Sequence, residues 1–250
     1  MKNLLTFSLS FCFFIVNAQD KNQFYALDAK MNQTVLDSSK YILWIHETDS
    51  AKWQWDYYLT WGSLVKSTTY SDHDGTVRSG RFCIYNAMGN LDSTGIYDHG
   101  KKNGTFFKLK SYSRDSIKII SQYEYLNDSL VQHTDLSSIS PENKIADSTA
   151  GNEPSYPGGI TGWEKYVKDN SQYPERARSK NIQGQVRIYF IVDKEGNIRD
   201  PYIQKSQEYS MDQEALRLIK KSGKWEPALR NGIPVNSNQL QYLNFTPENK

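Results

Sequence analysis

The stretch GQVRIYFIVDKEGN, residues 184–197, decides how the C-terminal part of this 250-residue chain folds. Its first nine residues alternate apolar and polar side chains, a pattern typical of a strand with one buried face. Asp193 to Asn197 then predicts a hairpin turn, with Gly196 at the position that needs a positive φ. The apolar residues expected on the buried face are Val186, Ile188, Phe190 and Val192.

Downstream of this hairpin the pattern predicts a disturbed strand and then a helix. The returning strand contains Pro201, and because proline cannot donate to a ladder we expect a bulge or a sheet edge there. Residues 210–213, SMDQ, fit a capping box in which the Ser210 hydroxyl caps a helix and Gln213 reaches back. An apolar stripe follows at Ala215, Leu216 and Ile219, and Gly223 ends the helix.

Two short helices precede the hairpin and one strand closes the chain. Trp163, Tyr166 and Val167 fall at helical spacing, and Pro174 is suited to the first position of a second helix over 174–178. After a turn over 230–235, a final strand ends in residues 240–245. The order helix, strand, strand, helix, strand predicts a small α+β layer fold.

Several short motifs in this region resemble, in order and spacing, the C-terminal domain of TonB, over about residues 153–247. They are Tyr156-Pro157-Gly158-Gly159, Tyr173-Pro174 with Ala177, Gly184-x-Val186, Phe190-x-Val192-Asp193, Gly196, Asp212-x-Glu214-Ala215, Lys224-Trp225-x-Pro227-Ala228, Asn231-Gly232-x-Pro234-Val235 and Asn244-Phe245. The resemblance implies a three-stranded antiparallel sheet with helices on one face.

The resemblance also implies a binding mechanism. In that family the last strand lies at an accessible sheet edge and pairs with an extended peptide from an outer-membrane receptor, which is strand addition. Leu243 and Phe245 would face the helices. The alternative is an ordinary strand covered by its own chain or by a second copy in a homodimer. The candidate peptide-binding residues are Asn238, Gln239, Leu240, Gln241, Tyr242, Leu243 and Asn244.

Residues 19–133 predict a mostly β N-terminal domain, because short alternating runs rich in aromatic residues are broken by Gly, Asn and Asp. Glycine and aromatic residues recur every 24 to 27 residues or so, which resembles MORN-type hairpin repeats. Four tryptophans crowd into this region, and we expect them to build a β core rather than a ligand site. They are Trp44, Trp53, Trp55 and Trp61.

Residues 1–18 predict a cleaved secretory signal, with Lys2 before an apolar run and Val16-Asn17-Ala18 as the cleavage site. The apolar run is shorter than the roughly 20 residues of a membrane-spanning helix. Residues 134–153 are rich in Ser, Asp and Asn and predict a linker before the 154–247 domain. We therefore expect a periplasmic protein of a Gram-negative bacterium without stable membrane insertion. An uncleaved inner-membrane anchor facing the periplasm is the alternative.

The net charge and the cysteine content bear on two further classes of function, nucleic-acid binding and thiol chemistry. The formal net charge of +2 gives no electrostatic footprint for nucleic acid. Cleavage of the signal would remove Cys12 and leave Cys83 alone, either as a small buried residue or as a reactive thiol; we expect the former.

No catalytic, cofactor or metal site is predicted. His46-Glu47 with Asp49 lacks the spacing of metal ligands, and Asp72-His73-Asp74-Gly75 is typical of a solvated turn. Cys83 and His99 offer a nucleophile and a base without a third orienting group. The glycine pairs in 158–159 and 100–104 lack a phosphate-loop pattern.

These observations favour a non-enzymatic envelope protein that binds a peptide or protein partner, such as an outer-membrane TonB-dependent receptor. A complete TonB energy transducer with an uncleaved anchor is the second hypothesis. A secreted enzyme with a site in the N-terminal half is the third.

Overall fold

The computed structural model describes residues 22–48, 50–112, 117–138 and 152–246. The expected signal over 1–18 and most of the expected linker lie outside these residues. Within the described ranges, no helix has both the length and the apolar character needed to cross a membrane.

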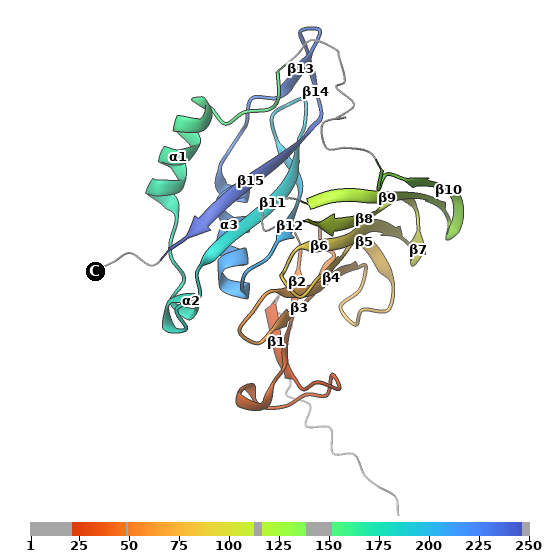
Figure 1. Ribbon diagram of the computed structural model, residues 1–250, viewed down its shortest axis with the longest axis vertical. Coiled ribbons are helices and arrows are strands. Elements are labelled where there is room, and N and C mark those ends of the chain that lie inside the picture. Colours follow the sequence, from red (N-terminus) through yellow and green to blue (C-terminus); the bar gives the residue numbers. More distant parts are fainter. Residues whose placement is uncertain (1–21, 49, 113–116, 139–151, 247–250) are drawn as a thin grey trace, which may run out of the picture.

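The N-terminal half forms an antiparallel ten-stranded sheet in which neighbouring strands follow one another along the chain (Figure 1). Only β7 lies off this path, pairing with β6. A short 3-10 helix, Leu36–Ser38, connects the first two strands. The strands are β1 (Asn22–Leu27), β2 (Tyr41–Glu47), β3 (Trp53–Leu59), β4 (Leu64–Tyr70), β5 (Arg78–Tyr85), β6 (Leu91–Asp98), β7 (Lys101–Lys102), β8 (Gly104–Ser111), β9 (Ile117–Leu126) and β10 (Ser129–Asp135).

This meander confirms the mostly β prediction for the N-terminal half. Successive hairpins are what a glycine and aromatic recurrence favours, but a meander alone does not identify MORN repeats, so that resemblance stays a prediction. Trp44 is buried, Trp53 and Trp55 are half-buried, and Trp61 is 42% exposed between Arg176 and Lys180.

The C-terminal half is the predicted α+β layer fold. Its three-stranded sheet has the order β12-β11-β15, with antiparallel pairing throughout. The inward side chains of β11 are fully buried beneath the helices. The elements are α1 (Gly159–Asn170), α2 (Glu175–Ser179), β11 (Gly184–Val192), β12 (Ile198–Lys205), α3 (Tyr209–Lys221), β13 (Ala228–Arg230), β14 (Ile233–Val235) and β15 (Ser237–Phe245).

Three local predictions need correction. Glu208, not Ser210, is the N-cap of α3, and its carboxylate accepts hydrogen bonds from the Ser210 N–H at 2.8 Å and hydroxyl at 2.6 Å. Pro174 is the N-cap of α2, so the helix begins one residue later than expected. The expected turn over 230–235 is a small hairpin, in which β13 and β14 pair.

The disturbance expected at Pro201 is confirmed. The β11–β12 register shifts between Tyr189 and Ile191, and β12 is an outer strand of its sheet. Asp200, beside the proline, adopts a φ of 49°, which is uncommon for a residue with a side chain. The bulge turns the Asp200 carboxylate toward the N-terminal sheet, where it pairs with Arg81.

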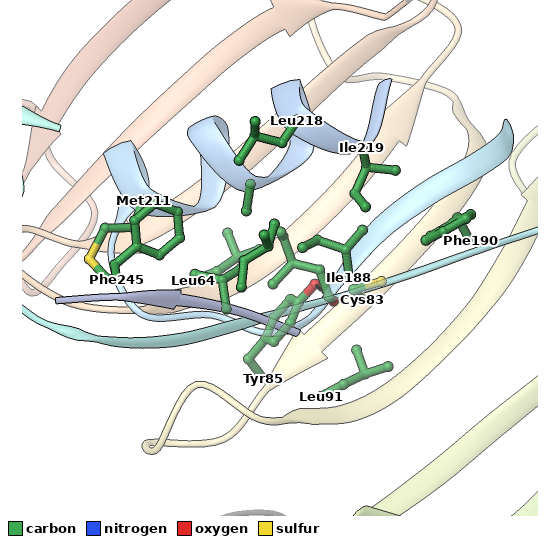
Figure 2. Packing of buried hydrophobic residues seen from close by; sticks show 14 of the residues in the cluster. Leu64, Cys83, Tyr85, Leu91, Ile188, Phe190, Met211, Leu218, Ile219 and Phe245 are labelled. Atoms are coloured by element: carbon green, nitrogen blue, oxygen red, sulfur yellow. Dashed lines mark hydrogen bonds between the residues drawn. The ribbon is translucent and has the colours of Figure 1, made fainter. Parts of the chain in front are cut away.

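The two halves share one hydrophobic core, as Figure 2 shows. Leu64, Cys83 and Tyr85 from the ten-stranded sheet lie in the same buried cluster as Ile188 of β11 and Leu218 of α3. A second, smaller cluster lies only within the N-terminal sheet and contains Leu27, Leu43 and Ile45.

Hydrogen bonds to backbone groups hold the two halves together at their junction. The Tyr85 hydroxyl donates to the Ile203 carbonyl at 2.7 Å, and the Leu64 N–H donates to the Ser206 hydroxyl oxygen at 2.7 Å. Ser206 N–H donates to the carbonyl of Gly89 at 2.8 Å. A Cβ on Gly89 would stand 2.3 Å from the Ser206 carbonyl oxygen, so the approach requires glycine. The ten-stranded sheet therefore lies against the C-terminal end of β12.

Candidate peptide-binding edge

The strand β15 lies at the edge of the C-terminal sheet. It pairs with β11 along all nine residues from Ser237 to Phe245, without a bulge. Among the described residues, no strand pairs with its other side. Figure 1 shows this side directed away from the ten-stranded sheet and toward α1. Every second residue of such a strand points its N–H and C=O groups away from its partner, so β15 offers unsatisfied backbone groups.

The predicted site residues divide between the two faces of the sheet. Leu243 is buried in the shared core, as is Phe245 next to the predicted set. The remaining predicted residues are exposed or half-buried. Asn238, Tyr242 and Asn244 are exposed, and Gln239, Leu240 and Gln241 are half-buried. The structure thus brings all seven onto one strand.

A groove of about 500 Å³ runs between β15 and α1. The strand contributes Gln239, Gln241 and Leu243, and the helix contributes Ile160 and Trp163. Ile160 is 79% exposed, so its apolar side chain is available to a strand that adds to this edge. The groove can therefore accept an apolar side chain of a strand that pairs with β15.

The groove rests on a packed aromatic cluster. The Trp163 ring lies 5.4 Å from both the Tyr156 and the Trp225 rings, and the Trp225 ring lies 5.1 Å from Phe190 of β11. The Trp225 indole N–H donates to the Ser222 hydroxyl at 2.9 Å. Because these rings hold one another, α1 is fixed at a set distance from β15.

On the opposite face of the sheet, side chains of β11 contact exposed side chains of β15. The Arg187 guanidinium lies 5.2 Å from the Tyr242 ring centroid, a cation–π arrangement. The Gln185 amide donates to the Asn244 side-chain oxygen at 3.0 Å. These contacts order the strand on the side where no helix covers it.

Sequence reasoning identified the strand but missed the groove. The available signal was the spacing of Ile160, Trp163 and Val167 at i, i+3 and i+7, which places three apolar residues on one helical stripe. Only Trp163 and Val167 entered the prediction. The exposure of Ile160 depends on how α1 sits beside β15, which sequence spacing does not contain.

The residues considered for catalysis do not assemble into an active site. His46 Nε2 lies 3.2 Å from Asp56 Oδ2, whereas Asp49 lies outside the described residues. Asp72 accepts the backbone N–H groups of Thr76 and Val77, both at 2.9 Å, as expected of a turn. In the part of the chain that is described, no group of three or more His, Cys, Asp or Glu side chains is placed to hold a metal ion.

Cys83 matches the expectation of a small buried residue. It is 1% exposed, and burial raises the pKa of its thiol, which disfavours the reactive thiolate. The His99 side chain is 88% exposed and lies against Asp98, with 2.7 Å between Nδ1 and Oδ1. A buried thiol and a solvated imidazole cannot act as a nucleophile and base pair.

Comparison with protein families gives one finding. Residues 169–247 match the family described as Gram-negative bacterial TonB protein C-terminal. The match lies within the 153–247 segment expected from the motifs and spans α2 to β15, so this part of the chain is similar to a domain of a Gram-negative envelope protein. The α1 wall of the groove and the whole ten-stranded sheet lie outside it. A search of curated proteins found no match.

Proposed function

We propose that this chain is a non-enzymatic, periplasmic binding protein that captures an extended segment of an outer-membrane receptor, or of another envelope protein, along β15. The observation that carries the proposal is the unpaired edge of β15 beside the groove formed with α1. The family match supports the same part of the molecule.

Strand addition explains why both features are needed. Main-chain hydrogen bonds to the edge give affinity without regard to sequence, and pockets for alternate side chains give selectivity. A segment paired with β15 would place one row of side chains in the groove against Ile160 and Trp163. We therefore propose that the partner carries a bulky apolar residue at alternate positions.

The junction between the two sheets covers part of the β12 edge of the three-stranded sheet and leaves the β15 edge for strand addition. The ten-stranded sheet engages the C-terminal end of β12, with a bridge between Asn90 and Lys205. The β15 edge on the other side has no such contact with that sheet (Figure 1). In this proposal the N-terminal half acts as a scaffold that covers one edge and orients the other.

We further propose that residues 1–18 are a cleaved signal and that residues 134–153 link the two halves. The family match also supports a second candidate, a complete energy transducer, which requires those first residues to stay as a membrane anchor. Reading the mature N-terminus in cell fractions decides between them. A product beginning at Gln19 in the periplasmic fraction supports the first candidate, and Met1 on a membrane-bound product supports the second.

Site-specific photo-crosslinking in cells tests the binding edge with the full chain. A photoreactive amino acid replaces Tyr242 on β15, and in a matched control it replaces Tyr112, which is similarly exposed (47% and 55%) but lies on the N-terminal half. An outer-membrane receptor should crosslink from the first position and not from the second. Equal yields at both positions would contradict the proposal.

A second pair of variants tests the groove. Ile160→Asp places a charge in the groove, so it should abolish the crosslink from position 242. Ile233→Asp makes the same change at an isoleucine that is 66% exposed on β14, and it should leave the crosslink unchanged. Both side chains are exposed, so neither variant is expected to unfold the protein.

A further inference from the structure

A polar cleft lies between the ten-stranded sheet and the C-terminal half, away from β15. It consists of two hollows of about 300 and 470 Å³, within the range of roughly 300–1,000 Å³ typical of small-molecule sites. The hollows share lining residues from both halves and therefore adjoin each other. None of their lining residues belongs to the groove beside α1. The shared residues are His46, Gln54, Ser67, Pro201, Tyr202 and Lys220.

The floor of the cleft is a hydrogen-bonded array on three adjacent strands. The Gln54 amide nitrogen donates to the two carboxylate oxygens of Asp56 at 3.0 and 3.1 Å and to the Ser67 hydroxyl at 3.1 Å. His46 Nε2 lies 3.2 Å from the same carboxylate. The Asp56 side chain is only 4% exposed and faces no lysine or arginine within ion-pair distance among the described residues.

This array has capacity for further hydrogen bonds. A carboxylate offers about four lone-pair sites, and a serine hydroxyl both donates and accepts. On the facing helix α3, Gln213 also lines the smaller hollow. A ligand with several donors and acceptors would use the remaining hydrogen-bonding capacity of Asp56 and Ser67.

The opposite wall is less polar. Pro201, Tyr202 and Leu216 are half-buried and line the smaller hollow. Tyr202 is held by the Arg81 guanidinium, 4.2 Å from its ring centroid, and by the Tyr189 ring at 5.2 Å. A ligand between this wall and the floor would therefore contact hydrogen-bonding groups on one side and apolar side chains on the other.

More basic than acidic residues line the cleft. Its basic lining residues are Lys52, Arg81, Arg199, Arg217, Lys220 and Lys221, against Glu47, Asp56 and Asp200. The three arginines are paired with Asp200, Asp193 and Glu214. Lys52 and Lys221 form no ion pair with any described residue. Lys52, whose ammonium also donates to the Ser79 hydroxyl at 3.2 Å, lines the larger hollow, and Lys221 lines the smaller one. Both lysines favour a ligand with a negative group.

We propose that this cleft binds an acidic saccharide, a sugar ring that carries a carboxylate. Its hydroxyl groups bond Asp56, Gln54 and Ser67, and one ring face packs against Tyr202 and Pro201. The carboxylate is attracted by Lys221, which lines the same hollow, and by Lys52 in the adjoining one. The site exists only where the two halves meet, so it gives the N-terminal sheet a ligand-binding role separate from peptide capture at β15.

Calorimetric titration of the full chain with matched sugars tests the proposal. The probes are glucuronic acid against glucose, and N-acetylmuramic acid against N-acetylglucosamine, so that each pair differs mainly in a carboxylate. At least one acidic sugar should bind, and its neutral counterpart should bind at least about fivefold more weakly. Absence of binding by both acidic sugars, or equal binding within both pairs, would overturn the proposal.

Variants then locate the binding. Ser67→Ala should weaken binding about fivefold through loss of one hydrogen bond, and Lys52→Gln with Lys221→Gln should remove the preference for the acidic sugar. Lys101→Gln, on β7, removes an exposed lysine outside the cleft and is the control. Thermal unfolding confirms that each variant is folded. Sugar affinities that match the unmodified chain in the Ser67 and double lysine variants would overturn the assignment to this cleft.

Discussion

Asp212 places a carboxyl group inside the junction between the two halves. It is fully buried in the first turn of α3, where one oxygen lies 2.5 Å from the Ser206 hydroxyl and the other accepts the Gln207 N–H at 3.1 Å. Burial raises the pKa of Asp212 to about 8, although these two hydrogen bonds oppose the shift; the nearby Glu208 carboxylate adds to it. Burial therefore favours the protonated side chain in the folded protein.

This shift predicts a pH-dependent stability. In the unfolded chain the pKa of an aspartate is about 3.9, so between about pH 4 and 8 the folded state binds more protons. The free energy of unfolding should fall as pH rises across this window, by up to about 1.4 kcal/mol per pH unit. Urea unfolding from pH 5 to 8.5 measures the slope.

Asp212→Asn keeps the shape of the protonated carboxyl and should flatten this slope. Asp169→Asn, at a half-exposed position on α1, is the control and should retain it. Other titrating groups are common to all three proteins, so they cancel in the comparison. An equal slope in the Asp212→Asn variant and the unmodified protein would show that Asp212 is ionised in the folded state.

Gly196 gives a second prediction at the residue scale. Its φ is 82°, and a Cβ there would stand 2.3 Å from the Trp225 carbonyl oxygen. Gly196→Ala should therefore lose more stability than the about 1–2 kcal/mol that a left-handed backbone costs a residue with a Cβ. Gly232, with a φ of 77° and no heavy atom within 4 Å of such a Cβ, is the control for the backbone effect alone. Equal losses in the two alanine variants, measured by urea unfolding, would exclude the steric contribution.

Single residues also show where sequence reasoning fails. Gly196 was predictable because turn geometry is local. The cap of α3 was not, because Glu208 takes that position through a tertiary contact: its carboxylate accepts the Arg176 side-chain N–H at 2.5 Å, and Arg176 also donates to the Thr60 carbonyl at 2.5 Å. A pattern over residues 210–213 contains nothing about Arg176.

At the scale of elements, β15 was predictable and its surroundings were not. Alternation and motif order placed the strand, and the family's arrangement implied an edge. The groove depends on the packing of α1 through Trp163 against Trp225, a pair 62 residues apart whose rings lie 5.4 Å from each other. Contacts between such distant segments leave no periodic trace in the sequence.

Proline substitution in β15 tests the edge directly. Backbone groups alternate along an antiparallel strand, so one of Gln241→Pro and Tyr242→Pro removes a donor to β11 and the other removes an outward donor. The first should be strongly destabilised. The second should keep near-normal thermal stability, because proline is tolerated where the N–H faces solvent, and should lose receptor crosslinking from a photoreactive residue at position 239. A stable variant that still crosslinks would exclude strand addition.

At the scale of the whole molecule, a shared core couples the two halves. The sequence suggested two regions joined by a linker, because local composition changes at residues 134–153. Local composition predicts the linker, but it does not predict whether the two halves pack against each other. Leu64 is 2% exposed, lies in one cluster with residues of β12 and α3, and also lines the polar cleft.

Leu64→Ala should therefore destabilise both halves. Truncation of a buried leucine costs about 2–5 kcal/mol, and hydrogen exchange should lose protection in β11 and α3 as well as in β4. Leu27→Ala is the matched control, because Leu27 is also buried but lies in the cluster confined to the N-terminal sheet; it should weaken protection in β1 and β2 while β11 keeps its own. If Leu64→Ala left β11 and α3 fully protected, the halves would be independent domains, and both the cleft and the orientation of β15 would lose their structural basis.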